Sequence, residues 1–304
     1  MRIDWSAAEQ FLAYADGEAT LDAVWGHPAY DVVRSHAELL GRDLSRSDVA
    51  RALEGEETTF SGVGTLDGNR EQVAAVLDHV RANEGAWTGE IERQLARITP
   101  DADRSEVDVY LGIGYSLGVG LEPGAYLNLA APLFLDRPRE VLYAAIHESS
   151  HVVYERSHHS RSELGPEDFE TREGQQRVFD TVFHTEAFAT YTPLALRRAD
   201  GNTGSRDHPM REDYQVLSDP ERLADLVAEY DSIRESMESG PVERETFVRH
   251  LFGGSRLPYR VGCALLDRIE ERQGVQAVRE AFYLDPSEFR ERYDPLLDEY
   301  RSGA

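Results

Sequence analysis

The sequence predicts an α+β fold that is mostly helical, in which a small mixed sheet packs on one buried helix. Apolar residues recur at intervals of three and four over most of the first hundred and last hundred residues, as in amphipathic helices. Residues 108–130, rich in valine, leucine, tyrosine and glycine, predict strands. With 304 residues the chain can form one large domain or two modest ones. We expect an N-terminal helical region at 1–104, a core at 105–200 and a C-terminal helical subdomain at 201–304.

The N-terminal region shows helical spacing of apolar residues in six segments. Glycines separate several of these segments, as they commonly do between helices. Residues 1–6 are expected to begin an acidic amphipathic helix rather than a signal peptide. The six predicted helices are 7–14, 19–25, 28–40, 47–53, 71–82 and 87–98.

Three strands are expected in the core, at 108–115, 118–121 and 125–130, with a turn around Pro123. We expect the last of them, around residues 126–130, to be the edge strand. An edge strand can bind an extended peptide through main-chain hydrogen bonds, which favours a peptide over a small ester as substrate.

The rest of the chain predicts helices. Residues 140–155 are apolar on most sides, as in a core helix, and 178–196 show apolar periodicity. Between these two helices, the polar stretch 156–177 is interpreted as an insertion or a lid. The predicted C-terminal helices are 223–237, 244–251, 261–273, 275–283 and 285–300.

The chain is extremely acidic, with a net charge of −25, and all its basic residues are arginines. A dispersed acidic surface is typical of proteins that work in molar salt, where screening removes the self-repulsion. A basic partner is the alternative explanation, and the absence of an arginine-rich patch argues against nucleic acid. The lone cysteine, Cys263, is expected in the core and allows no disulfide within the chain. No apolar run approaches the length of a membrane span, so a cytoplasmic location is expected.

The most informative motif is HExxH, formed by His147, Glu148 and His151 within the predicted core helix. Positions four apart lie on one face of a helix, so both imidazoles can reach one metal ion. Glu148 projects beside them and can accept a proton from metal-bound water. Unpaired histidines in a core helix would cost several kcal/mol. The motif therefore predicts a Zn²⁺ site, against the alternative of a chance match in a structural helix.

A third ligand is needed, because catalytic zinc usually takes three protein ligands and one water. Glu186 is the favoured candidate, since small and apolar residues flank it in an inward-facing pattern. The metzincin pattern is disfavoured, because Tyr154 and Ser157 stand where it requires Gly and His. The rival ligands are His184, followed by Glu170, His158 and His159.

HExxH followed by Glu-x-x-Ala at residues 186–189 resembles the gluzincin metallopeptidases, the thermolysin-like group. Residues 257–266 are similar to the Pro-Tyr-x-x-Gly-x-x-Leu segment of aminopeptidase N-like gluzincins. The resemblance covers about residues 108–282 and implies a zincin-like core. It also implies that Tyr259 stabilises the oxyanion of the tetrahedral intermediate. Tyr259 packing at a helix start is the alternative.

The chain departs from the aminopeptidases in two places. Leu127 stands where the aminopeptidases carry the glutamate that holds the substrate's amine, so exopeptidase activity is not implied. The stretch between His151 and Glu186 is longer than in the aminopeptidases. Arg260 is a candidate for binding a substrate carboxylate.

These observations predict a zinc-dependent peptidase acting on a peptide or protein. His147, His151 and Glu186 would hold the zinc ion, Glu148 would be the general base and Tyr259 the oxyanion donor. Two alternatives remain. One is a zinc-binding regulatory protein with little or no catalysis, its cleft blocked by residues 156–177. The other is a structural helical protein with a fortuitous motif.

Overall fold

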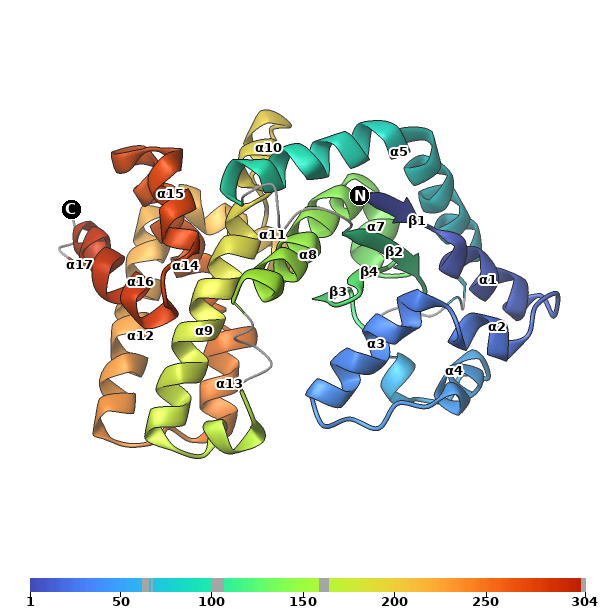
Figure 1. Ribbon diagram of the computed structural model, residues 1–304, viewed down its shortest axis with the longest axis horizontal. Helices are drawn as coiled ribbons and strands as arrows, with labels where there is room; N and C mark the ends of the chain where they lie inside the picture. The colour runs from blue at the N-terminus through green and yellow to red at the C-terminus, as the bar shows by residue number, and fades with distance from the viewer. Residues whose placement is uncertain (62–65, 67, 100–106, 159–163, 302–304) are drawn as a thin grey trace. The chain divides into compact units, whose positions relative to one another are not determined.

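The computed structural model describes residues 1–61, 66, 68–99, 107–158 and 164–301. The chain is mostly helical and contains one mixed four-stranded sheet, which confirms the α+β prediction at that level (Figure 1). It forms two compact units. Unit 1 comprises Met1–Ala96 and Pro100–Val153, and unit 2 comprises Arg97–Thr99 and Tyr154–Ala304.

The sheet belongs to unit 1 and has the strand order β1-β2-β4-β3. β1 pairs parallel with β2 and β2 parallel with β4, whereas β3 pairs antiparallel with β4. The four strands are β1 (Arg2–Asp4), β2 (Asp108–Gly112), β3 (Gly118–Leu121) and β4 (Gly124–Asn128).

Two predictions about this sheet are wrong. β4 is an inner strand rather than the edge, because Leu121 pairs with Gly124 across a tight turn and the glycine-rich β3 takes the outer position. The first residues form a strand rather than the start of a helix. Ile3 is buried there opposite Val109, and this burial in the sheet outweighs local helical preference.

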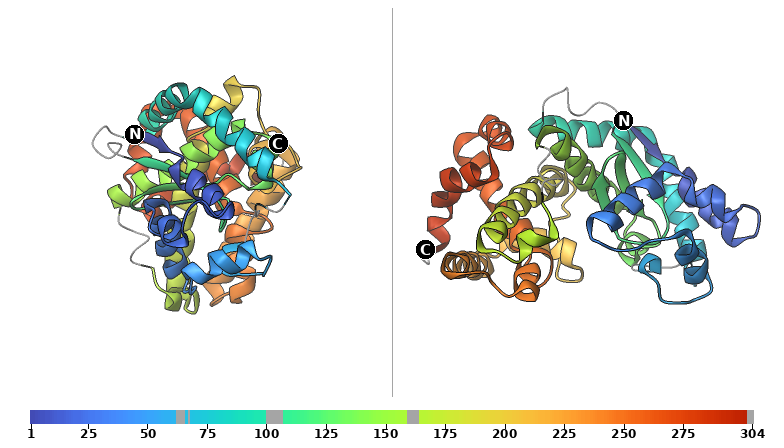
Figure 2. Two further views of the ribbon diagram at one scale, coloured as in Figure 1. Left: turned by 90° about the vertical axis from the view of Figure 1, so that its right-hand side faces the viewer. Right: turned by 60° about the horizontal axis from the view of Figure 1, so that its bottom comes forward.

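The sheet lies between two helices of unit 1. Gly120 of β3 approaches His151 of α8, so that face of the sheet lies on the helix that carries the motif. Tyr126, on the other face, contacts Tyr30 of α3 with tilted rings whose centroids are 6.1 Å apart, and α3 covers that face (Figure 2). The helices of this part of the chain are α1 (Ser6–Ala15), α2 (Leu21–Trp25), α3 (Pro28–Leu39), α4 (Arg46–Leu53), α5 (Arg70–Ile98), α7 (Pro132–Asp136) and α8 (Arg139–His158).

α5 is one continuous helix where two were predicted. The polar stretch between the predicted halves includes Gly85, whose added Cβ would meet nothing within 4 Å, so this glycine lies on an open side of the helix. A glycine in that place lowers helix stability by about 1 kcal/mol without breaking the helix.

The secondary structure of unit 2 consists of helices, with no strand among its described residues. α9 and α14 pack closely, because Gly262 leaves room for Ala187, whose Cβ would stand 2.6 Å from a Cβ on the glycine. Cys263 is buried, as predicted. The helices are α9 (Arg172–Tyr191), α10 (Leu194–Ala199), α11 (Pro209–Gln215), α12 (Pro220–Ser239), α13 (Arg244–Phe252), α14 (Leu257–Gln273), α15 (Val275–Phe282), α16 (Pro286–Tyr293) and α17 (Asp298–Arg301).

The predicted last helix, 285–300, is interrupted. Between α16 and α17 the chain forms a short 3-10 turn, η5 (Asp294–Leu297), which contains Pro295. Proline lacks the N–H that would continue the α-helix. The apolar spacing continues across Pro295, which is why one helix was predicted where the structure has two. Across the described residues, no helix combines the length and the apolar character that crossing a bilayer would need.

Candidate metal centre

Two imidazoles of α8 meet at their Nε2 atoms. Residues 140–154 of this helix are all buried, so the side chains of His147 and His151 point into the protein. Their Nε2 atoms lie 3.1 Å apart, and their rings cross at 80° with centroids 4.8 Å apart. The i, i+4 spacing thus directs both nitrogen atoms to one point, as the sequence predicted.

The buried carboxylate of Glu186, in α9, completes a group of three possible ligands. His147, His151 and Glu186 each offer one ligand atom, and these atoms all lie within 4.8 Å of one another. Burying ionisable groups beside one another costs several kcal/mol unless their charge is compensated. A divalent cation would supply that compensation, so the group could hold a metal ion. Two imidazoles and one carboxylate are donors that fit Zn²⁺ and leave a position open.

The position of Glu186 follows from its helix. The second half of α9 is buried almost without interruption, from Phe183 to Tyr191. The small residues that flank Glu186 allow this burial. They are also the feature of the sequence that favours Glu186 as the third ligand. Such a helix places a carboxylate inside the protein, where it is 5% exposed.

Glu148 is buried beside two glycines of β3. A Cβ on Gly118 would stand 2.5 Å from Oε1 of Glu148. A Cβ on Gly120 would overlap the backbone carbonyl oxygen of Glu148 and lie 2.6 Å from Cβ of His151. Both positions therefore need glycine for the edge strand to approach the motif. Sequence reasoning missed this role, although the alternate glycines of a strand shortly before the motif were a visible signal.

His184, the main rival ligand, uses both ring nitrogens for structure. Its Nε2 lies 3.1 Å from the carbonyl oxygen of Ala281, which can only accept, so Nε2 carries the proton. Nδ1 then accepts a hydrogen bond from the Tyr154 hydroxyl at 2.7 Å. Complete burial lowers the pKa of His184 to about 3, and the ring is neutral. It has no lone pair left for a metal.

The other rivals lie elsewhere. Glu170 is exposed and forms an ion pair with Arg244 at 2.9 Å. His158 stacks on Tyr154 with ring centroids 4.1 Å apart, and its Nδ1 donates to the Tyr154 carbonyl oxygen. His159 lies outside the described residues.

Tyr259 lies in the first turn of α14 beside a buried cation. The guanidinium carbon of Arg256 stands 3.6 Å from the centre of the Tyr259 ring. Arg256, in the left-handed conformation at φ 47°, also binds Asp213 through two nitrogens at 2.8–3.0 Å. Burial lowers the pKa of Arg256, but Asp213, then Tyr259 and Glu186, raise it overall. One positive charge thus acts on both Tyr259 and Glu186.

Arg260 does not serve the role expected for it. Its side chain is 2% exposed, and it pairs with Asp213 at 3.0 Å and with Glu212 at 2.9 Å. A guanidinium held by two carboxylates is a structural element of the α11–α14 contact rather than a receptor for substrate.

Comparisons with protein-family models, with curated proteins and with solved structures found no match to this chain.

Proposed function

We propose that the protein is a zinc-dependent peptidase with a gluzincin-like site. The observation that supports this most strongly is the convergence of His147, His151 and Glu186, with Glu148 next to His147 on the same helix. The donor set suits zinc, and a glutamate adjacent to such a set is the usual proton acceptor in zinc hydrolases.

Zinc bound there would polarise a water molecule and the carbonyl group of the substrate. Glu148 accepts the proton of the attacking water on its carboxylate and later returns it to the leaving amine. Tyr259 donates a hydrogen bond to the oxyanion that develops on the carbonyl oxygen, a role in which such donors contribute about 3 kcal/mol. Arg256, packed on the ring of Tyr259, restricts the orientation of that ring.

The position of β3 supports a peptide substrate. β3 is an outer strand of the sheet, and its Gly118 lies beside the Glu148 carboxylate. An extended peptide that pairs with this strand would carry its carbonyl groups past Glu148. The sequence predicted β4 as the edge strand, which is wrong. Because β3 has an open edge instead, the argument for a peptide substrate applies to β3.

The experiment compares Glu148→Gln with Glu155→Gln, which changes a carboxylate on the same helix outside the motif. Both variants and the wild type are purified with zinc, analysed for metal content, and assayed with mixed peptides in molar salt. We expect all three to hold about one zinc and only Glu148→Gln to lose turnover. Turnover in Glu148→Gln, or a wild-type chain that binds no zinc, would overturn the proposal.

A further inference from the structure

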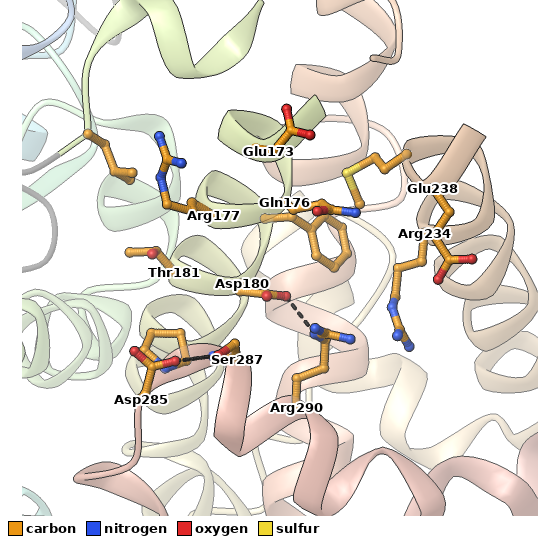
Figure 3. Close-up of a pocket in the computed structure, with 14 residues that line it drawn as sticks. Glu173, Gln176, Arg177, Asp180, Thr181, Arg234, Glu238, Asp285, Ser287 and Arg290 are labelled. Atoms are coloured by element: carbon orange, nitrogen blue, oxygen red, sulfur yellow. Dashed lines mark hydrogen bonds and ion pairs between the residues drawn. The ribbon is translucent and has the colours of Figure 1, made fainter. Parts of the chain in front are cut away.

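Unit 2 contains a second candidate site, separate from the three possible metal ligands. A cavity of about 620 Å³ lies between α9, the end of α12 and the start of α16 (Figure 3). Its volume falls within the range of small-molecule sites in proteins. The residues that line it are both charged and apolar, the latter including Phe179 and Met237.

A partly buried ion pair forms one wall of the cavity. Nε of Arg290 lies 2.7 Å from Oδ1 of Asp180, and the two side chains are 19% and 13% exposed. Within the described part of the chain, the guanidinium of Arg290 has no ion pair or hydrogen bond with any other residue. Its two terminal NH₂ groups are therefore not used by a residue other than Asp180. Two parallel N–H donors on a guanidinium fit the two oxygens of a carboxylate.

A second guanidinium adds positive charge to the same wall. Arg234 of α12 lines the cavity and pairs with Asp294 at 3.0 Å. Burial raises the pKa of Asp180 to about 6, against the opposing effect of Arg290 and then Arg234. Burial also lowers the pKa of Arg290, but the charge of Asp180 outweighs this and raises it overall. The pair thus holds a fully charged arginine beside a carboxylate that is costly to ionise.

Exposed carboxylates also line the cavity. Glu173 and Glu238 are exposed residues that line the cavity, and neither has an ion pair or hydrogen bond among the described residues. The amide of Gln176 and the hydroxyl of Thr181 also line it. The cavity therefore offers guanidinium donors on one wall and carboxylates that can attract an ammonium group.

The carboxylates in the lining of the cavity distinguish between ligand classes. Glu173 and Glu238 repel an anion at short range even where salt screens the net charge of −25, so a carboxylate alone would enter at an electrostatic cost. A zwitterion has no net charge and satisfies both kinds of group. We propose that this cavity binds a zwitterion, a free amino acid or a short peptide, with its carboxylate on Arg290 and its ammonium group towards Glu173 and Glu238.

Calorimetry with defined probes tests this proposal. The probes are trialanine, its C-terminal amide, its N-acetyl form, free alanine and acetate, titrated into the full chain carrying Glu148→Gln to prevent turnover. We expect trialanine or alanine to bind, and amidation or acetylation to weaken trialanine by about tenfold or more. Binding of trialanine alone identifies a peptide site, and equal binding of alanine identifies an amino-acid site.

Three substitutions locate the binding. Arg290→Gln should abolish the binding of trialanine or alanine to the cavity. Arg292→Gln, which changes an exposed arginine on the same helix, should leave this binding unchanged. Asp180→Asn breaks the same ion pair but keeps Arg290, so it should retain binding. If Asp180→Asn lost binding as Arg290→Gln does, the effect would come from the broken pair and the proposal would fail.

Three other results would overturn it: no binding of trialanine or alanine, equal binding of the amide or of acetate, or equal binding by Arg290→Gln and Arg292→Gln. Arg290→Gln and Arg292→Gln have the same metal centre, so a difference between them does not depend on the peptidase proposal.

Discussion

Gly118 leaves the space that the carboxylate of Glu148 occupies: a Cβ on this glycine would stand 2.5 Å from Oε1. Gly120, two residues further along the strand, leaves the space that the backbone carbonyl of Glu148 and the Cβ of His151 occupy. The two glycines therefore fit against different parts of the motif. Gly118 meets the proposed base, and Gly120 meets the helix that carries the proposed ligands.

This difference predicts two distinct phenotypes. Gly118→Ala should displace the Glu148 carboxylate, keep zinc and lower kcat by about tenfold or more, because small misplacements of a reacting group are costly. Gly120→Ala should shift the backbone of α8 and weaken zinc retention as well. Zinc content under a chelator and peptide turnover distinguish the two. Gly89→Ala, whose Cβ would meet nothing within 4 Å, is the control and should raise stability by about 1 kcal/mol. Two variants with wild-type zinc content and activity would show that β3 adapts freely.

Metal retention should separate Glu186 from His184, two residues earlier. Glu186→Gln should lose zinc at a chelator concentration that leaves the wild type loaded, because a ligand charge is removed. His184→Gln should keep zinc but lower the free energy of unfolding by about 1–3 kcal/mol, because the hydrogen bonds to Tyr154 and Ala281 are disturbed. Metal analysis after dialysis, with urea unfolding, tests both. The reverse pattern would make His184 the ligand.

Tyr259→Phe should lower kcat by about a hundredfold and leave KM nearly unchanged, if the hydroxyl contacts only the developing oxyanion. Tyr283→Phe, at an exposed position in the same unit, is the control. Steady-state kinetics on one peptide measures both. A wild-type kcat in Tyr259→Phe would reduce the residue to a packing role against Arg256.

The buried carboxyl of Asp180 predicts a pH effect on stability. Its pKa in the folded protein is about 6, above the value of about 3.8 expected when unfolded. A raised folded pKa gives a contribution to stability that is fully present below about pH 3.8 and is lost as the pH rises through 6. That difference corresponds to about 3 kcal/mol. Relative to Asp180→Asn, the wild type should lose about this much stability between pH 4 and 7.

Urea unfolding at intervals of pH measures this difference. Asp225→Asn, an exposed change on α12, should follow the wild type throughout. A constant difference between Asp180→Asn and the wild type would mean that the Asp180 carboxyl ionises normally in the folded state.

The net charge of −25 predicts that stability rises with salt. The Debye length falls from about 10 Å at 0.1 M to about 3 Å at 1 M, so repulsion between the carboxylates is screened. The midpoint of thermal unfolding should therefore increase between dilute and molar KCl. A midpoint that falls with salt would show that the arginine–carboxylate ion pairs stabilise the protein more than the repulsion destabilises it. It would contradict the prediction that the acidic surface is an adaptation to molar salt.

Local patterns predicted more of this protein than long-range ones. The convergence of His147 and His151 follows from the geometry of a single helix, so a motif of five residues was sufficient to predict it. The choice of Glu186 rested on its small neighbours, which signal burial within one helix. Local patterns could not predict which strand forms the edge of the sheet. That depends on which side of β4 the strand Gly118–Leu121 pairs with, and this is a long-range property of the fold. The partners of His184 and Arg260 likewise come from segments far away in the sequence.

The contact between Gly262 and Ala187 lies close to two residues that are proposed for different tasks. Gly262 lies one turn after Tyr259 on α14, and Ala187 directly follows Glu186 on α9. Only the methyl group of Ala187 lies between the helix backbones there, so the two helices pack closely at this point. The helix that carries the proposed metal ligand and the helix that carries the proposed oxyanion donor therefore depend on one close contact, and Gly262→Leu should disturb both residues at once without changing either.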